Sequence, residues 1–169
     1  NRKITRKEIE ATMARVRRKL PDVAWRTTFI VGFPTETEQD FEELVDFVSD
    51  GHFQHLGIFL YSDEDNIRSS KFGDPIPLSL KEERKNRLME IQQKISREHH
   101  QKMVGSLQQV LVGGFSSETD LLLEGRNQYQ GPEVDGVVYI NEGNSTSAGF
   151  HQVEITEAHE YDLVGKILN

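Results

Sequence analysis

The sequence contains no cysteine, and this absence excludes several kinds of chemistry. Without thiols the chain forms no disulfide, no thiolate metal site and no cysteine-ligated iron–sulfur cluster of its own. Long apolar runs are also missing, since none approaches the roughly 20 residues that a membrane-spanning helix needs. The amino-terminal residues are polar and basic, without the apolar segment of a secretory signal. We therefore expect a cytoplasmic protein that does not enter a membrane.

Positive charge is scarce in one part of the chain. The formal net charge of the 169 residues is −8 at pH 7. Residues 1–102 hold 18 basic and 18 acidic side chains, whereas residues 103–169 hold only Arg126 and Lys166 against ten carboxylates. The second segment should repel a phosphate backbone, whose binding depends on Lys and Arg. It suits a strongly basic protein partner, although acidity that merely favours solubility is the alternative.

Hydrophobic periodicity in the first hundred residues predicts alternating helices and strands. We expect a helix that Pro21 terminates, a buried strand at 24–31, a helix at 36–50, a second buried strand at 56–61 and a long helix at 79–103. Capping boxes mark the helix starts, in the pairs Thr5 with Glu8, Thr35 with Glu38 and Ser79 with Glu82. The predicted buried stripes are Ile9, Met13, Val16 and Leu20; Phe41, Leu44, Val45 and Val48; and Leu88, Ile91 and Ile95. This order is typical of a parallel sheet with crossover helices.

The strand and helix around residues 26–48 are joined at Gly32 and Pro34. Such a turn places free backbone amides at the carboxyl end of a strand, where α/β folds bind ligands. A packing unit of an α/β barrel without a ligand is the alternative interpretation.

After Gly105 the pattern changes to short β-prone runs separated by Gly, Asn, Ser and Pro. The runs lie at 106–113, 119–125, 136–140, 151–156 and 161–168. Five short strands predict a small closed barrel of the oligonucleotide/oligosaccharide-binding (OB) type. We therefore predict two domains, an α/β domain at 1–103 and an OB-like barrel at 104–169.

Two strands are too few for a complete α/β domain, which usually has five or more. We expect residues 1–103 to be the carboxyl-terminal portion of a larger α/β barrel, in a chain truncated at Asn1.

Three segments resemble one enzyme family. They are RTTFIVGFPTETE at 26–38, LGIFLYSDED at 56–65, and a set made of Gly125-Arg126, GPEVDGVV at 131–138 and EYDLVG at 160–165. The first two are similar to the methylthiotransferase branch of the radical S-adenosylmethionine enzymes, which usually have Gly in place of Thr35. The third resembles the carboxyl-terminal TRAM domain of the RimO-type members, which modify an aspartate of small-subunit ribosomal protein twelve.

The resemblance implies a catalytic mechanism that this chain cannot perform alone. Two 4Fe-4S clusters, S-adenosylmethionine and a basic protein of the small ribosomal subunit would be the cofactors and partner. The cluster cysteines would lie outside this chain, so the fragment itself would hold no metal and be inactive.

The resemblance also implies candidate site residues. Ile30, Gly32, Phe33 and Pro34 correspond to the segment near the adenine ring, and Arg26 is a candidate for the methionine carboxylate. Tyr61 either faces this site or packs in the core. In the barrel, a loop with Arg126, Glu133 and Asp135 is a candidate docking site, and Asp135-Gly136 also reads as a plain turn. We expect solvated side chains at all six histidines, which are His52, His55, His99, His100, His151 and His159.

Two other functions compete with this interpretation. A methylthiotransferase acting on adenosine in transfer RNA is the first, and it should carry a basic barrel. A non-catalytic binding module with an acidic OB-type barrel is the second. Cysteine triads upstream in the coding sequence would distinguish an enzyme from the module.

Overall fold

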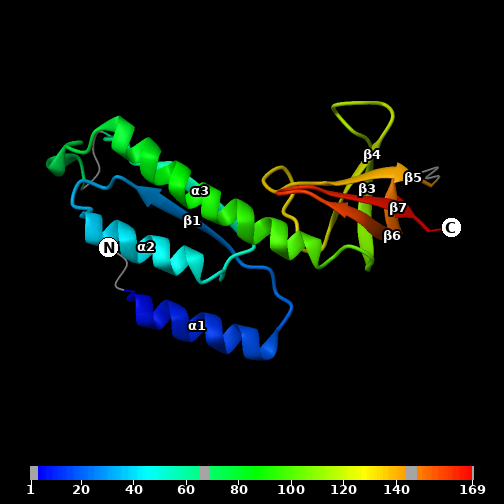
Figure 1. The fold of residues 1–169 in the computed structure, drawn as a ribbon, viewed down its shortest axis with the longest axis horizontal. Coiled ribbons are helices and arrows are strands. Elements are labelled where there is room, and N and C mark those ends of the chain that lie inside the picture. The colour runs from blue at the N-terminus through cyan, green and yellow to red at the C-terminus, as the bar shows by residue number, and fades with distance from the viewer. Residues whose placement is uncertain (1–3, 65–68, 144–147, 169) are drawn as a thin grey trace.

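The computed structural model describes residues 4–64, 69–143 and 148–168 (Figure 1). In chain order the elements are α1 (Arg6–Lys19), β1 (Arg26–Val31), α2 (Glu38–Ser49), β2 (His55–Leu60), a 3-10 turn at Ser70–Phe72, α3 (Leu78–Gln101), β3 (Leu107–Phe115), β4 (Leu123–Asn127), β5 (Val138–Glu142), β6 (Gly149–Ala158) and β7 (Leu163–Ile167). The helices and first two strands form an α/β unit, and the five later strands form a closed barrel. The predicted fold class, α/β followed by all-β, is confirmed.

The α/β unit contains a two-stranded parallel sheet with helices on one face. β1 and β2 pair from Arg26 opposite His55 to Val31 opposite Leu60. Side chains of α2 and α3 complete a core cluster with the strands, formed by Val31, Phe41, Val45, Val48, Ile58 and Leu88. On the other face Ile30 is 56% exposed, and Phe59, its partner in register, is 63% exposed. The expectation of two fully buried strands is therefore wrong for this open face of the sheet.

Helix α1 packs on the outer side of α2. Its start is confirmed, because Thr5 and Glu8 form the expected capping box. Met13 is buried in a cluster with Phe47 and Phe53, whereas Leu20, at the end of the predicted stripe, is 58% exposed. The expected apolar stripe of α1 is thus buried only in part.

The starts of the other two helices differ from the prediction. The N-cap of α2 is Thr37, which forms a capping box with Asp40, so the pair Thr35 and Glu38 is wrong. The N-cap of α3 is Pro77, with no side-chain hydrogen bond, so Ser79 does not cap the helix. Gly51 follows α2 with a φ of 69°, as expected of a glycine after a helix end.

The barrel closes in the strand order β3-β4-β5-β7-β6. Neighbouring strands are antiparallel except for β5 and β7, which run parallel. Inward-facing side chains fill the interior as a dry core of Val110, Val112, Val138, Ile140, Val153, Ile155, Leu163 and Ile167. The five-stranded barrel is thus confirmed, although β4 begins at Leu123 rather than near residue 119.

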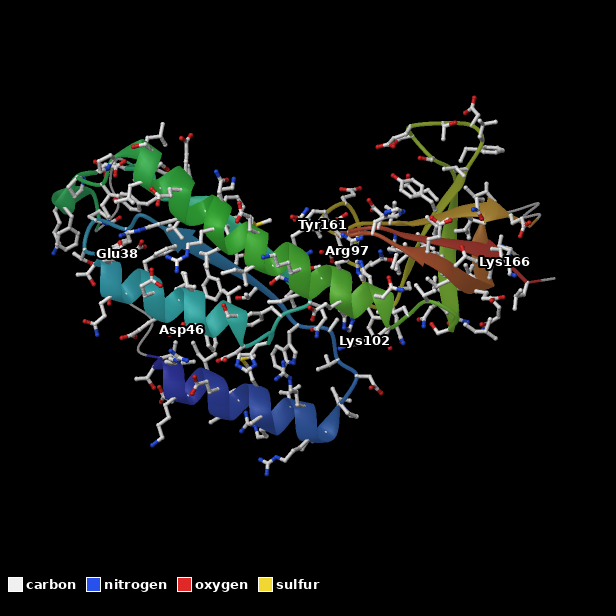
Figure 2. All side chains as sticks on the ribbon, in the orientation of Figure 1. Glu38, Asp46, Arg97, Lys102, Tyr161 and Lys166 are labelled. Carbon is white, nitrogen blue, oxygen red and sulfur yellow. The ribbon has the colours of Figure 1, made fainter. Side chains whose placement is uncertain are left out.

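Helix α3 runs from the α/β unit to the barrel, and both units meet near its carboxyl end (Figure 1). Figure 2 shows Arg97 of α3 beside the turn that carries Tyr161, and Arg97 lies 3.4 Å from Glu160 in that turn. None of the helices within the described ranges is long and apolar enough to cross a membrane.

Candidate functional site

The structure brings most of the predicted cofactor residues together at the carboxyl ends of β1 and β2. Ile30 lies near the end of β1, and Gly32, Phe33 and Pro34 follow that strand directly. Tyr61 follows β2, and its ring stands edge-on to that of Phe33, with 5.3 Å between the ring centres. These five residues therefore share one edge of the sheet.

Arg26 is the exception. It is the first residue of β1, and four residues of a strand extend about 13 Å, so it lies far from Ile30. Its guanidinium donates to the carboxylate of Asp135 in the barrel. The structure therefore does not bring Arg26 to the other candidate cofactor residues, and instead places it where the two units meet.

Gly32 is a structural residue of this edge. Its backbone φ is 77°, a value that residues other than glycine rarely adopt. A Cβ at this position would lie 2.4 Å from Lys81 Cγ. Gly32 is buried, and its N–H donates to Glu36 Oε2 at 2.9 Å. The expectation of a free amide at Gly32 is therefore wrong, because Glu36 already occupies it.

Two buried cations of α3 fix the turn, and the sequence analysis missed both. Lys81 is 2% exposed, and its Nζ donates to Tyr61 O at 2.8 Å and to both carboxylate oxygens of Asp74 at 2.5 and 2.6 Å. Arg84, 4% exposed, donates to Glu36 at 2.6 Å. Since charged groups are rarely buried without partners, these contacts explain how both cations lie inside. Their position within the charged run at residues 81–85 gave no sequence signal of burial.

Two side chains at this edge are exposed and available to a ligand. Ile30 and Phe33 are exposed apolar groups, at 56% and 38%. The Tyr61 hydroxyl is buried and has no hydrogen-bond partner among the described residues. Tyr61 as a whole is only 7% exposed, so it packs beneath Phe33 and its hydroxyl is not open to a ligand.

The inner face of α3 is polar rather than apolar. The buried residues of the helix are Lys81, Arg84, Leu88, Gln92, Ser96 and His100. Of the predicted stripe Leu88 is fully buried, whereas Ile91 and Ile95 are only partly so. Gln92 Nε2 donates to Phe53 O at 3.1 Å, and Ser96 Oγ donates to Gln54 O at 3.2 Å. The four-residue spacing of this polar set was the signal that could have revealed it.

Two of the histidines are not solvated, which corrects the sequence expectation. His100 is 6% exposed, and its Nδ1 lies 3.1 Å from His159 O. The side chain of His55 is 14% exposed, with Nδ1 3.0 Å from Asp135 Oδ1 and Nε2 2.9 Å from Tyr129 O. Burial, aided by the charge of Arg26, lowers the pKa of His55 to about 4. Burial also lowers the pKa of His99 and of His100.

The three candidate docking residues of the barrel line one groove of about 370 Å³. Arg126 and Glu133 are exposed at its rim, and Glu133 has a φ of 63°. Asp135 differs, because its side chain is only 4% exposed and faces the α/β unit. Four glycines also line the groove, at positions 113, 125, 131 and 136. Of these glycines Gly113 is exposed, whereas Gly125 is buried against β3.

No group of three or more potential metal ligands from His, Cys, Asp and Glu occurs in residues 4–64, 69–143 and 148–168.

Comparison with known proteins identifies the barrel and the relatives of the whole chain. Residues 104–168 match the TRAM domain family. The chain is 48% identical over 168 residues to the ribosomal protein uS12 methylthiotransferase RimO of Bdellovibrio bacteriovorus, which covers 99% of the chain and 37% of the relative. It is 46% identical to the RimO of Desulfotalea psychrophila over 100% of the chain and 38% of the relative. It is 44% identical to the RimO of Aquifex aeolicus, over 89% of the chain and 35% of the relative.

Proposed function

We propose that this chain, which belongs by sequence to the RimO-type methylthiotransferases, is the carboxyl-terminal part of an enzyme that methylthiolates the β-carbon of an aspartate in ribosomal protein uS12. The observation that carries the proposal is the similarity along nearly the whole chain to relatives named for that activity. The chain spans 37% and 38% of the length of those two relatives, so the activity is that of a longer protein. Because the proposed substrate is ribosomal, we place the reaction in the cytoplasm.

The α/β unit would form one wall of the S-adenosylmethionine site. Ile30 and Phe33 offer exposed apolar surface suited to a flat ring, and the buried Tyr61 ring supports Phe33 from below. Gly32 and Pro34 shape the turn that holds Phe33. When bound, S-adenosylmethionine supplies the hydrogen-abstracting adenosyl group and the methyl group. The residues of this chain bind and orient it.

Iron–sulfur clusters do not fit the residues of this chain. Such clusters are held by cysteine thiolates, and the chain has none. We therefore assign both 4Fe-4S clusters to other parts of a longer protein, and we expect this chain alone to be inactive.

The barrel would dock the substrate protein. Only two cations lie in residues 103–169, against ten carboxylates, which favours a basic protein over a nucleic acid. Arg126 and Glu133 at the rim of the groove are the candidate contacts. Asp135 is less accessible, because it is engaged by Arg26 and His55.

A salt-series titration of this chain against uS12 and, separately, against bulk transfer RNA tests the proposal. We expect binding to uS12 that weakens as salt rises, because screening weakens contacts between exposed charges. Glu133→Gln together with Glu124→Gln removes two carboxylates that line the groove, and at low salt this double variant should bind uS12 more weakly than the parent chain. Glu90→Gln on α3 is the matched control and should bind as the parent does. Binding to transfer RNA with none to uS12 would contradict the proposal and favour the transfer-RNA enzymes.

A further inference from the structure

The two units of the chain are not joined by a shared hydrophobic core. The barrel cluster includes Met103 and Val104 from the connecting segment, and no side chain of α1, α2, α3, β1 or β2 within the described ranges. The main cluster of the α/β unit likewise contains no barrel residue among those described. Apart from Met103 and Val104, which continue α3 into the barrel core, the contacts between the two units are mainly polar.

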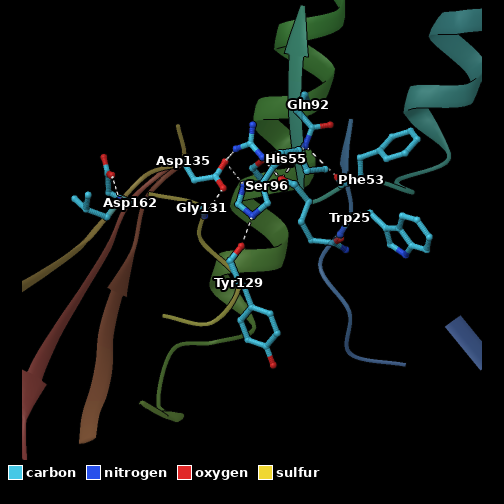
Figure 3. Close-up of polar contacts among 12 residues, drawn as sticks. Trp25, Phe53, His55, Gln92, Ser96, Tyr129, Gly131, Asp135 and Asp162 are labelled. Carbon is cyan, nitrogen blue, oxygen red and sulfur yellow. Dashed lines mark hydrogen bonds and ion pairs between the residues drawn. The ribbon is translucent and has the colours of Figure 1, made fainter. Parts of the chain in front are cut away.

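The polar contacts converge on Asp135. Its Oδ1 accepts a hydrogen bond from the Arg26 guanidinium and lies 3.0 Å from His55 Nδ1. Its Oδ2 accepts from Gly131 N within its own loop at 2.7 Å (Figure 3). The other ring nitrogen of His55, Nε2, lies 2.9 Å from Tyr129 O, and since a neutral imidazole carries one N–H it donates to only one of these two oxygens at a time. A carboxylate that is 4% exposed and paired on both sides is costly to leave unpartnered.

The remaining contacts across the joint are weaker. Arg97 and Glu160 are 3.4 Å apart, with side chains 65% and 36% exposed. Exposed pairs of this kind contribute little. The contact of His100 with His159 O, at 3.1 Å, is a single hydrogen bond to a backbone carbonyl. Asp135 is therefore the main anchor among the described contacts.

Both sides of the Asp135 contact are rigid. On the barrel side, Gly136 passes so close to Tyr161 that a Cβ would lie 1.8 Å from its carbonyl oxygen, and Val137 N donates to Asp162 Oδ1 at 2.9 Å. On the other side, Arg26 and His55 are paired in register at the first positions of β1 and β2. The carboxylate thus connects a fixed loop to the amino end of a fixed sheet.

We propose that Asp135 is a positioning residue, which fixes the direction of the barrel relative to the α/β unit by bonding Arg26 and His55 together. The role goes beyond the proposed function, because it holds whether the barrel docks a protein, an RNA or nothing. Two residues of the PEVDG run at 132–136 would then have different roles. Glu133 faces the groove on the barrel surface, and Asp135 faces the joint.

The absence of cysteine makes a distance measurement straightforward, since introduced thiols are the only labelling sites. Spin labels at Asp46→Cys on α2 and Gln152→Cys on β6, both exposed positions, report the distance between the units by double electron–electron resonance. We expect one narrow distribution in the labelled parent. Asp135→Asn should broaden it at least about twofold, because loss of the charge weakens the bonds to Arg26 and His55 and leaves only the weaker contacts to restrain the units. Asp120→Asn removes an exposed barrel carboxylate and should leave it narrow.

If Asp135→Asn unfolds the barrel, two further variants test the same contact from the side of the α/β unit. Arg26→Gln and His55→Gln leave the barrel sequence intact, and each should broaden the distribution. Combining Arg26→Gln with Asp135→Asn should add nothing to Asp135→Asn alone, since both remove the same contact. A distribution that stays as narrow as the parent in Asp135→Asn, or in both α/β variants if the barrel does not fold, would overturn the proposal. This result would not bear on the methylthiotransferase assignment.

Discussion

At the scale of single residues, close backbone approaches decide which positions tolerate change. Gly136 and Gly113 both line the barrel groove, yet their surroundings differ. A Cβ on Gly136 would lie 1.8 Å from Tyr161 O, whereas on Gly113 the nearest atom would be Glu124 O at 3.9 Å. The first distance is impossible without backbone movement, and the second is an ordinary contact.

Gly136→Ala should therefore destabilise the chain by about 1–3 kcal/mol, the usual cost of forcing extra atoms into a packed site. Gly113→Ala, in the same groove, should change the free energy of unfolding by less than about 0.5 kcal/mol. Urea unfolding followed by circular dichroism measures both. Equal midpoints for the two variants would show that the 131–136 loop is free to move away from Tyr161.

At the scale of helices and strands, the first residue of α2 could not be predicted from local sequence alone. Two overlapping pairs fit the capping pattern, Thr35 with Glu38 and Thr37 with Asp40, and local sequence cannot choose between them. The choice depends on Glu36, whose side chain is held by Gly32 N at 2.9 Å and Arg84 at 2.6 Å. These tertiary contacts keep residue 36 outside the helix, so the later pair becomes the cap.

Thr37→Ala should cost about 1 kcal/mol of stability, the typical loss for an N-cap side chain. Thr35→Ala is the matched control, an exposed threonine two residues earlier, and should have a small effect. The measurement is the unfolding midpoint in urea. A larger loss for Thr35→Ala than for Thr37→Ala would restore the cap originally expected.

The strands and the barrel were predictable because their apolar residues follow simple periods. The polar inner face of α3 was not, since Lys81, Arg84 and Gln92 read as surface residues until their partners are known. Those partners, such as Asp74 and the Phe53 carbonyl, lie on other elements. For the site, the grouping of Ile30, Phe33 and Tyr61 was expected from the family resemblance, and the parallel pairing of β1 and β2 brings these residues to one edge. The separate position of Arg26 was missed, because its partner Asp135 is 109 residues away in sequence.

At the scale of the whole molecule, buried histidines make stability depend on pH. The pKa values of His55, His99 and His100 are all lowered, chiefly by burial, and that of His55 falls from 6.5 to about 4. The folded state therefore binds fewer protons than the unfolded state below pH 6.5. Folding stability that is fully present above pH 6.5 is lost as the pH falls towards 4.

The free energy of unfolding should thus decline steadily as the pH falls from 6.5 towards 4.5, above the range in which most carboxylates titrate. Urea titrations across this range measure the slope. His55→Gln should reduce the slope, because it removes one of the three imidazoles whose pKa is lowered by burial. A flat profile in the parent chain would contradict neutral, buried histidines.

The reaction proposed above is that of a longer protein that contains this chain. The most direct measurement is mass spectrometry of uS12 and of transfer RNA, each incubated with that protein, reconstituted clusters, S-adenosylmethionine and a reductant. We expect a methylthio group on one aspartate of uS12 and none on transfer RNA. Modification of adenosine in transfer RNA, with uS12 unchanged, would contradict this expectation.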